Sequence, residues 1–362
     1  MFTPRGSISH AAKTVAATVF AGALGAAAVA GAGTAAAAEP APLGSAEVSA
    51  SVQGSLMDQP ENDPNLPIGE DPFLGPLPVP FNIAAGVKAA LAPQVAPPGA
   101  NDWNCKPSAE HPRPVVLVNP TVTTQALAFQ AGAPLLHNAG YCVFTFNYGN
   151  VTPFPDFPAQ ALGDIPTGAQ VLSDTVDRVL AASGAEQVDL VGHSQGGGIM
   201  PDYYLKELGG AEKVHTKVGI SPSTGTSLST LAFLRTLIPV LGPIVYGSID
   251  TLTPASTQQV YDSEVSKKVY PDGVVSPAEG VENYAIVTDQ DEVVTPYTGQ
   301  FYEGVPEDHN ILLQDGCVVD RSEHVSTMYN ERAWRHVLNS LDPERRQGVP
   351  CFPVAPFAPW VK

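Results

Sequence analysis

Short apolar segments alternate with segments of helical periodicity from Arg113 onward, and this alternation limits the fold more than any other feature. The apolar segments are brief and carry many β-branched residues, which is typical of buried strands. The strand candidates are 115–118, 142–148, 188–191, 217–221, 284–288 and 310–313. The helix candidates are 125–138, 168–182, 197–208 and 325–341. This order predicts an α/β fold with a mainly parallel central sheet and helices on both faces, over residues 101–362.

Two segments differ from this pattern. Twelve of the 36 prolines fall between residues 40 and 98, so 39–100 is expected to form a proline-rich N-terminal arm with one short helix near Ile83–Leu91. Between Pro222 and Ser248 the only charged residue is Arg235, in a stretch that proline and glycine interrupt too often for a membrane span. About 223–280 is therefore expected to be an inserted cap or lid. Its apolar part is either an ordinary buried helix or an apolar wall over the active site.

The first 38 residues have the pattern of a secretory signal peptide. Arg5 and Lys13 form a basic region before an apolar run over 14–33, and Ala35–Ala38 offers a cleavage site of small residues. A retained membrane anchor is the alternative, but the run consists mostly of alanine and glycine. Cleavage leaves 16 basic against 36 acidic residues, about 20 net negative charges. We therefore expect a secreted protein whose main partner is neither nucleic acid nor an anionic membrane.

Four cysteines remain after cleavage, at positions 105, 142, 317 and 351. An even number in an exported protein indicates two disulfides, and three pairings are possible. No two cysteines have the C-x-x-C spacing, so we expect no metal site.

The sequence GHSQG over 192–196 places Ser194 between two glycines, after the apolar run VDLV and before a helical segment. This is the strand–turn–helix context of a nucleophile elbow, in which a tight turn raises the serine hydroxyl above the edge of the sheet. A glycine-rich structural turn is the alternative. A nucleophilic serine also needs a histidine base and an acid to orient it, and in this architecture they follow in the order serine, acid, histidine.

The acid is expected in NYAIVTDQDEVVTPY, just after a strand. We favour Asp291, because the run that follows it leads into an apolar turn, and Asp289 is the alternative. The base is expected in a late loop, which favours His324 in DRSEHVS. His309 precedes the last strand, and His336 lies within a helix. His193 comes before the acid and is expected to pack beside the elbow.

An oxyanion hole completes this chemistry. One donor is expected to be the backbone N–H of Gln195, which follows the nucleophile. The other should come from the loop after the first strand, VVLVNPTVTTQ. Pro120 has no N–H, but Thr121 offers its backbone N–H and its hydroxyl.

Several of these segments together resemble a known family. They are RPVVLVNPT, GYCVFTFNYG, GHSQGG, DEVVTP and the D-x-x-E-H sequence that ends at His324. They resemble secreted lipases of the α/β-hydrolase fold, namely the class 2 bacterial triacylglycerol lipases and lipases of the Candida antarctica lipase B type. The resemblance covers about residues 100–352. It implies Ser194 as nucleophile, Asp291 as acid, His324 as base, and Thr121 and Gln195 in the oxyanion hole.

The resemblance also implies the disulfide pairing Cys105–Cys142 and Cys317–Cys351, and it implies no cofactor. One departure concerns the oxyanion loop. The bacterial lipases usually carry His-Gly where this chain has Asn119-Pro120, and proline cannot adopt the backbone angles open to glycine.

We expect a lipase or carboxylesterase that cleaves lipid or other apolar esters, some of them at a lipid–water interface, and acts as a monomer. Two alternative functions remain for the same fold. An acyltransferase would pass the acyl group to an alcohol or sugar, and a non-catalytic binding protein would keep only the scaffold.

Overall fold

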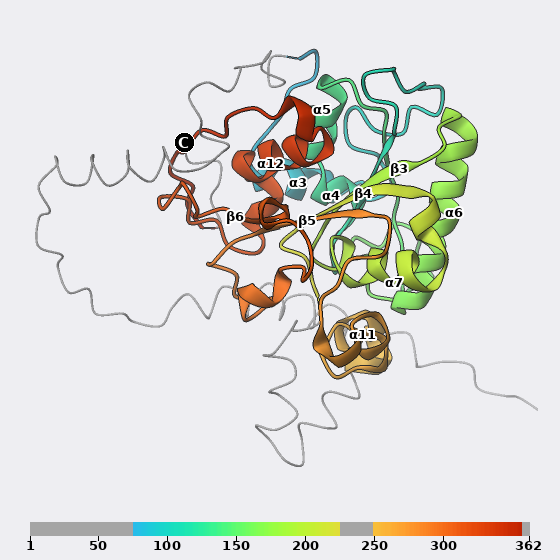
Figure 1. The fold of residues 1–362 in the computed structure, drawn as a ribbon. Coiled ribbons are helices and arrows are strands. Elements are labelled where there is room, and N and C mark those ends of the chain that lie inside the picture. The colour runs from blue at the N-terminus through green and yellow to red at the C-terminus, as the bar shows by residue number, and fades with distance from the viewer. Residues whose placement is uncertain (1–74, 225–248, 357–362) are drawn as a thin grey trace, which may run out of the picture. The chain divides into compact units, whose positions relative to one another are not determined.

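The computed structural model describes residues 75–224 and 249–356. Its centre is a six-stranded sheet of order β2-β1-β3-β4-β5-β6, in which every neighbouring pair is parallel (Figure 1). The strands are β1 (Val115–Val118), β2 (Val143–Thr145), β3 (Val188–His193), β4 (Val214–Ile220), β5 (Glu282–Val287) and β6 (Asn310–Leu312). The predicted α/β fold with a mainly parallel sheet is confirmed. In a parallel sheet the carboxyl ends of all strands meet at one edge, where the following loops gather.

Helices cover both faces of this sheet. Successive strand residues point to opposite faces, so an apolar strand has apolar side chains to bury on both sides. Val116 and Val118 lie in one buried apolar cluster with residues of α6 (Ile165–Ser183) and α7 (Ile199–Glu207). Val115 and Leu117 lie in a second cluster with residues of α5 (Gly132–Asn138) and α12 (Glu331–Leu341). Figure 1 shows these two pairs of helices on opposite sides of the strands. Strands buried on both faces have continuous apolar sequences, which explains the pattern in the sequence.

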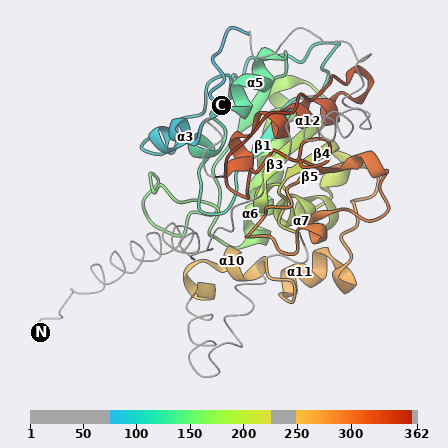
Figure 2. The ribbon, with the colours of Figure 1, turned by 90° about the vertical axis from the view of Figure 1, so that its left-hand side faces the viewer.

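The other α-helices of the described residues are α3 (Ile83–Ala89), α4 (Gln125–Ala128), α10 (Pro254–Gln258) and α11 (Glu264–Val269), and short 3-10 helices lie in the loops. The helix expected near Ile83–Leu91 is α3, which begins where the Asn82 side chain accepts a hydrogen bond from the Ala85 N–H. Helices α10 and α11 follow β4 in the chain, and Figure 2 shows them together beside the ends of α6 and α7. They belong to the segment expected to form a cap.

Two predicted helices are each broken in two. The segment 125–138 leaves helical geometry at Phe129, and Gly132 begins α5 so close to the Trp334 ring that a Cβ atom there would lie 2.0 Å from it. The segment 325–341 is interrupted at Asn330, whose extended backbone and side-chain oxygen cap the N–H groups of Arg332 and Ala333. In both places the apolar spacing continues across the break, because both pieces pack on the same face of the sheet.

Several expectations lie wholly or partly outside the described residues: the signal peptide over 1–38, the first part of the arm over 39–74, and the apolar stretch of the cap over 228–246. Within residues 75–224 and 249–356, no helix is both long enough and apolar enough to cross a membrane.

The structure contains the two disulfides that the resemblance implied. Cys105 pairs with Cys142, which ties the segment before β1 to the start of β2. Cys317 pairs with Cys351, so the loop that follows β6 is joined to the last part of the described chain.

Candidate active site

The turn after β3 holds Ser194 at the carboxyl edge of the sheet. Ser194 has φ 53°, in the left-handed region that non-glycine residues rarely adopt. The turn is tight enough to exclude side chains two residues before and two residues after the serine, at Gly192 and Gly196. A Cβ atom on Gly192 would lie 1.9 Å from the Gly196 carbonyl oxygen, and one on Gly196 would lie 2.2 Å from the Val118 carbonyl oxygen. The sequence therefore folds here into a turn with the geometry of a nucleophile elbow, and α7 begins at Ile199.

Asp291 and His324 meet from the loops that follow β5 and β6. His324 Nδ1 lies 2.8 Å from Asp291 Oδ2, and both side chains are buried. The structure thus brings Asp291 to the histidine, whereas Asp289 lies in an exposed turn. His309 lies at the amino end of β6, stacked on Tyr284, and His336 is buried within α12.

Four N–H groups converge on the Asp291 carboxylate. Oδ1 accepts hydrogen bonds from the backbone of Val293 at 2.9 Å and Val294 at 2.7 Å. Oδ2 accepts from His324 and from Gln300 Nε2, at 3.0 Å. Gln300 is fully buried and was not singled out by the sequence analysis. These donors fix the carboxylate in one orientation toward the imidazole.

Charges around the pair favour an ionised acid and a histidine that readily takes up a proton. Burial raises the pKa of Asp291, but His324 and the surrounding N–H donors outweigh it, so the pKa lies below its ordinary value. Burial lowers the pKa of His324, but the carboxylates of Asp291, Glu292 and Glu323 outweigh it, so the pKa lies above its ordinary value. Glu292 Oε2 is 3.5 Å from the His324 backbone N. An imidazole with a raised pKa and an ionised partner is suited to accept a proton.

His193 links the elbow to the loop that carries His324. Its Nε2 lies 2.7 Å from the His324 carbonyl oxygen and 3.1 Å from Thr327 Oγ1, and the two imidazole rings are 4.9 Å apart. Burial, followed by the charge of His324, lowers the pKa of His193 to about 3, so the ring is neutral. A carbonyl oxygen can only accept, so the ring proton is on Nε2. Because His193 directly precedes Ser194, this hydrogen bond ties the His324 backbone to the serine turn.

The loop after β1 lies against the same turn. Gln195 Nε2 donates to Thr121 Oγ1 at 2.9 Å, so the two residues expected in an oxyanion hole are in contact through their side chains. In the loop that carries the Asn119-Pro120 pair, Val122 adopts the left-handed conformation, with φ 70°. The Asn119 amide donates to the Thr123 carbonyl at 2.8 Å and closes the loop. A second buried glutamine, Gln259, also donates to Thr121 Oγ1, at 3.0 Å, and no motif in the sequence marks this residue.

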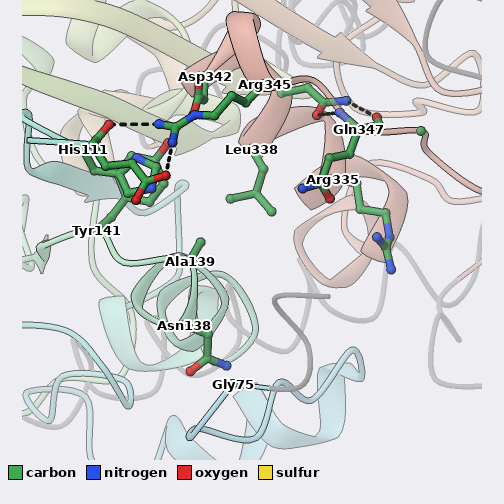
Figure 3. Close-up of a pocket in the computed structure, with 13 residues that line it drawn as sticks. Gly75, His111, Asn138, Ala139, Tyr141, Arg335, Leu338, Asp342, Arg345 and Gln347 are labelled. Carbon is green, nitrogen blue, oxygen red and sulfur yellow. Dashed lines mark hydrogen bonds and ion pairs between the residues drawn. The ribbon is translucent and has the colours of Figure 1, made fainter. Parts of the chain in front are cut away.

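A separate cavity of about 710 Å³ lies between α12 and the segment before β1 (Figure 3). His111, Tyr141 and Leu338 contribute to its wall, and none of the candidate active-site residues does. Two arginines line it: Arg345 is paired with Asp342 and Glu110, and Arg335 is paired with Glu331. Within the described ranges, no group of three His, Cys, Asp or Glu side chains is arranged to hold a metal ion.

A parallel sheet with a serine elbow after β3, followed by an aspartate and a histidine after β5 and β6, defines the hydrolase class of α/β proteins. The chain belongs to the α/β-hydrolase fold family, whose sequence profile matches residues 114–308. Comparison with curated proteins found no match.

The chain is also similar to several solved structures. Aspergillus fumigatus lipase B superposes with a TM-score of 0.50 at 19% identity, over 72% of this chain and 58% of that one, so the match spans less than two thirds of that lipase. An α/β hydrolase from the sediment metagenome of the Mar Chica lagoon in Morocco has a TM-score of 0.42 at 16% identity, over 66% and 93% of the two chains. Carboxylesterase CesB of Bacillus subtilis has a TM-score of 0.38 at 14% identity, over 66% and 86%. At 19% identity, the similarity to the Aspergillus lipase supports the fold alone.

Proposed function

We propose that the protein is a secreted serine ester hydrolase, of the lipase or carboxylesterase type, that acts through an acyl-enzyme on Ser194. The observation that carries the proposal is the 2.8 Å contact between Asp291 and His324, whose loop is held beside the serine elbow by His193. Membership of the α/β-hydrolase fold family supports it. The class 2 lipase assignment rests on the sequence resemblance and forms the finer part of the proposal.

In the proposed mechanism, His324 removes the proton of the Ser194 hydroxyl as its oxygen attacks the ester carbonyl. Asp291 holds the imidazole in the tautomer with a proton on Nδ1 and stabilises the imidazolium that forms. The backbone N–H of Gln195 and the Thr121 hydroxyl or N–H donate to the oxyanion. His324 then returns the proton to the leaving alcohol, and a water molecule, activated in the same way, releases the acid and restores Ser194.

The proposed substrates are lipid or other apolar esters, and the protein is expected to act as a monomer, without nucleic acid as a partner. The stretch between Pro222 and Ser248, whose only charged residue is Arg235, supports apolar substrates, and the acidic net charge argues against nucleic acid. The two disulfides and the pattern of the first 38 residues support secretion.

The test is hydrolysis of p-nitrophenyl esters from acetate to palmitate, with a triglyceride emulsion in parallel. Labelling with a fluorophosphonate and the variant Ser194→Ala identify the nucleophile. We expect wild-type protein to turn over several esters and take up the label, and Ser194→Ala to lose both properties. Full activity in Ser194→Ala would refute the proposal. Transfer of the acyl group to an added alcohol in preference to water would instead identify an acyltransferase.

A further inference from the structure

The Thr121 hydroxyl has an unusual set of partners. Its oxygen receives two hydrogen bonds, from Gln195 Nε2 at 2.9 Å and from Gln259 Nε2 at 3.0 Å. Each amide nitrogen also donates to a backbone carbonyl, Gln195 to Ala161 at 3.2 Å and Gln259 to Ala255 at 2.9 Å. Since carbonyl oxygens only accept, both amides are held with their nitrogen atoms toward Thr121.

This arrangement fixes the direction of the remaining proton. A hydroxyl oxygen has two lone pairs and one hydrogen, and here both lone pairs accept from amides. The hydroxyl hydrogen must therefore point away from both glutamines. Gln195 and Gln259 are buried, whereas Thr121 is only half buried, so one side of the residue is open. Gln195, which directly follows Ser194 in the chain, is the residue that joins this turn to the loop carrying Thr121.

We propose that Gln259 is a positioning residue of the oxyanion hole, which together with Gln195 makes the Thr121 hydroxyl a dedicated proton donor to the substrate oxyanion. The inference rests on the ester-hydrolase function proposed above. Gln259 immediately follows α10, in the segment after β4. The inference therefore gives this segment a part in the chemistry.

The position of Gln259 depends on how α10 is seated. The Ala255 N–H donates to the Leu162 carbonyl at 3.1 Å, and Gln258 Oε1 accepts from the Ile165 N–H at 2.7 Å. The Gln258 amide also donates to Asp164 at 2.8 Å. Helix α10 is thus anchored to the loop that precedes α6, which also supplies the carbonyl of Ala161. Gln259 can reach the Thr121 hydroxyl only when α10 is anchored to this loop.

The test compares Gln259→Glu with Gln259→Met. A carboxylate at this position accepts the Thr121 proton and diverts it from the substrate, whereas a thioether leaves the hydroxyl free to rotate. We expect kcat on p-nitrophenyl butyrate to fall about 10- to 100-fold in Gln259→Glu, and less in Gln259→Met, with KM nearly unchanged. The control is Gln170→Glu, the same change on the exposed side of α6, which should keep the wild-type kcat.

A double-mutant cycle with Thr121 separates positioning from simple structural support. The Gln259→Glu effect should persist with Thr121→Ser, which keeps a hydroxyl, and vanish with Thr121→Val. Multiplicative losses in the Thr121→Val background, or a kcat within twofold of wild type in Gln259→Glu, would overturn the inference. If Gln259→Glu does not fold, Gln259→Met serves in the same cycle. Activity that survives Ser194→Ala would instead refute the proposed function itself, so the two failures are distinguishable.

Discussion

Replacing Asp291 by asparagine tests how the four donors around the carboxylate set the state of the histidine. The carboxylate accepts from Val293, Val294, Gln300 and His324. An asparagine oxygen has only two lone pairs, and the two backbone N–H groups cannot rotate away. The amide oxygen of Asp291→Asn should therefore face Val293 and Val294, and its NH₂ group should face Gln300 and His324.

The consequence for His324 is a change of tautomer. Nδ1 must accept from the new NH₂ group, so the ring proton moves to Nε2, the nitrogen that should receive the Ser194 proton. We expect kcat to fall about 10⁴-fold, the size of effect found when the orienting acid of a serine hydrolase becomes an amide. The stability cost should be modest, about 1–3 kcal/mol, because only the Gln300 hydrogen bond is lost.

Steady-state hydrolysis of p-nitrophenyl butyrate and urea unfolding measure the two effects. The matched control is Asp289→Asn, the same change in the exposed turn two residues earlier, which should retain activity within about twofold. Activity of Asp291→Asn within tenfold of wild type would refute the reasoning. So would an equal loss in the Asp289 variant.

Three further predictions concern pH, the elbow and the cross-link. Because the pKa of His324 is raised and catalysis needs the neutral base, the pH–rate profile of kcat/KM should rise through a midpoint above pH 6.5. The Glu292 carboxylate contributes to this raised pKa, so Glu292→Gln should move the midpoint to lower pH. Gly192→Ala should lower the free energy of unfolding by at least about 3 kcal/mol, measured by thermal unfolding, because the new Cβ atom would clash with the backbone. The control Gly184→Ala, with φ 80° and no neighbouring atoms, should lower it by about 1–2 kcal/mol. Cys317→Ser opens a cross-link of sequence separation 34, and urea unfolding should show a loss of about 3–4 kcal/mol.

Much of the fold could be predicted because the sheet is buried on both faces. The four residues of β1, Val115–Val118, have the same bounds in the prediction and in the structure. Helix ends were harder to predict, since a break such as that at Asn330 depends on a side chain capping the backbone while the apolar spacing continues. The disulfide pairing came from the family resemblance, as the count of cysteines alone left three possibilities.

The site was predictable only where the residues follow strands in a fixed order. Ser194 directly follows β3, and Asp291 and His324 lie in the loops after β5 and β6, so the topology directs all three toward one edge of the sheet. Gln259 and Gln300 carry no such signal. Gln259 directly follows α10 and Gln300 ends a short 3-10 helix, Tyr297–Gln300, and the importance of each depends on which atoms the folded chain brings to its amide.

The hydrogen bond between His193 and the His324 carbonyl spans 131 residues of sequence and joins the two halves of the site. Outward movement of the His324 loop must break this bond in a place shielded from water, while it also disturbs the strand that ends in the elbow. Intermediate, half-open arrangements are therefore costly. Loss of activity on heating should then follow a single curve that coincides with global unfolding, without an earlier local melting of the loop.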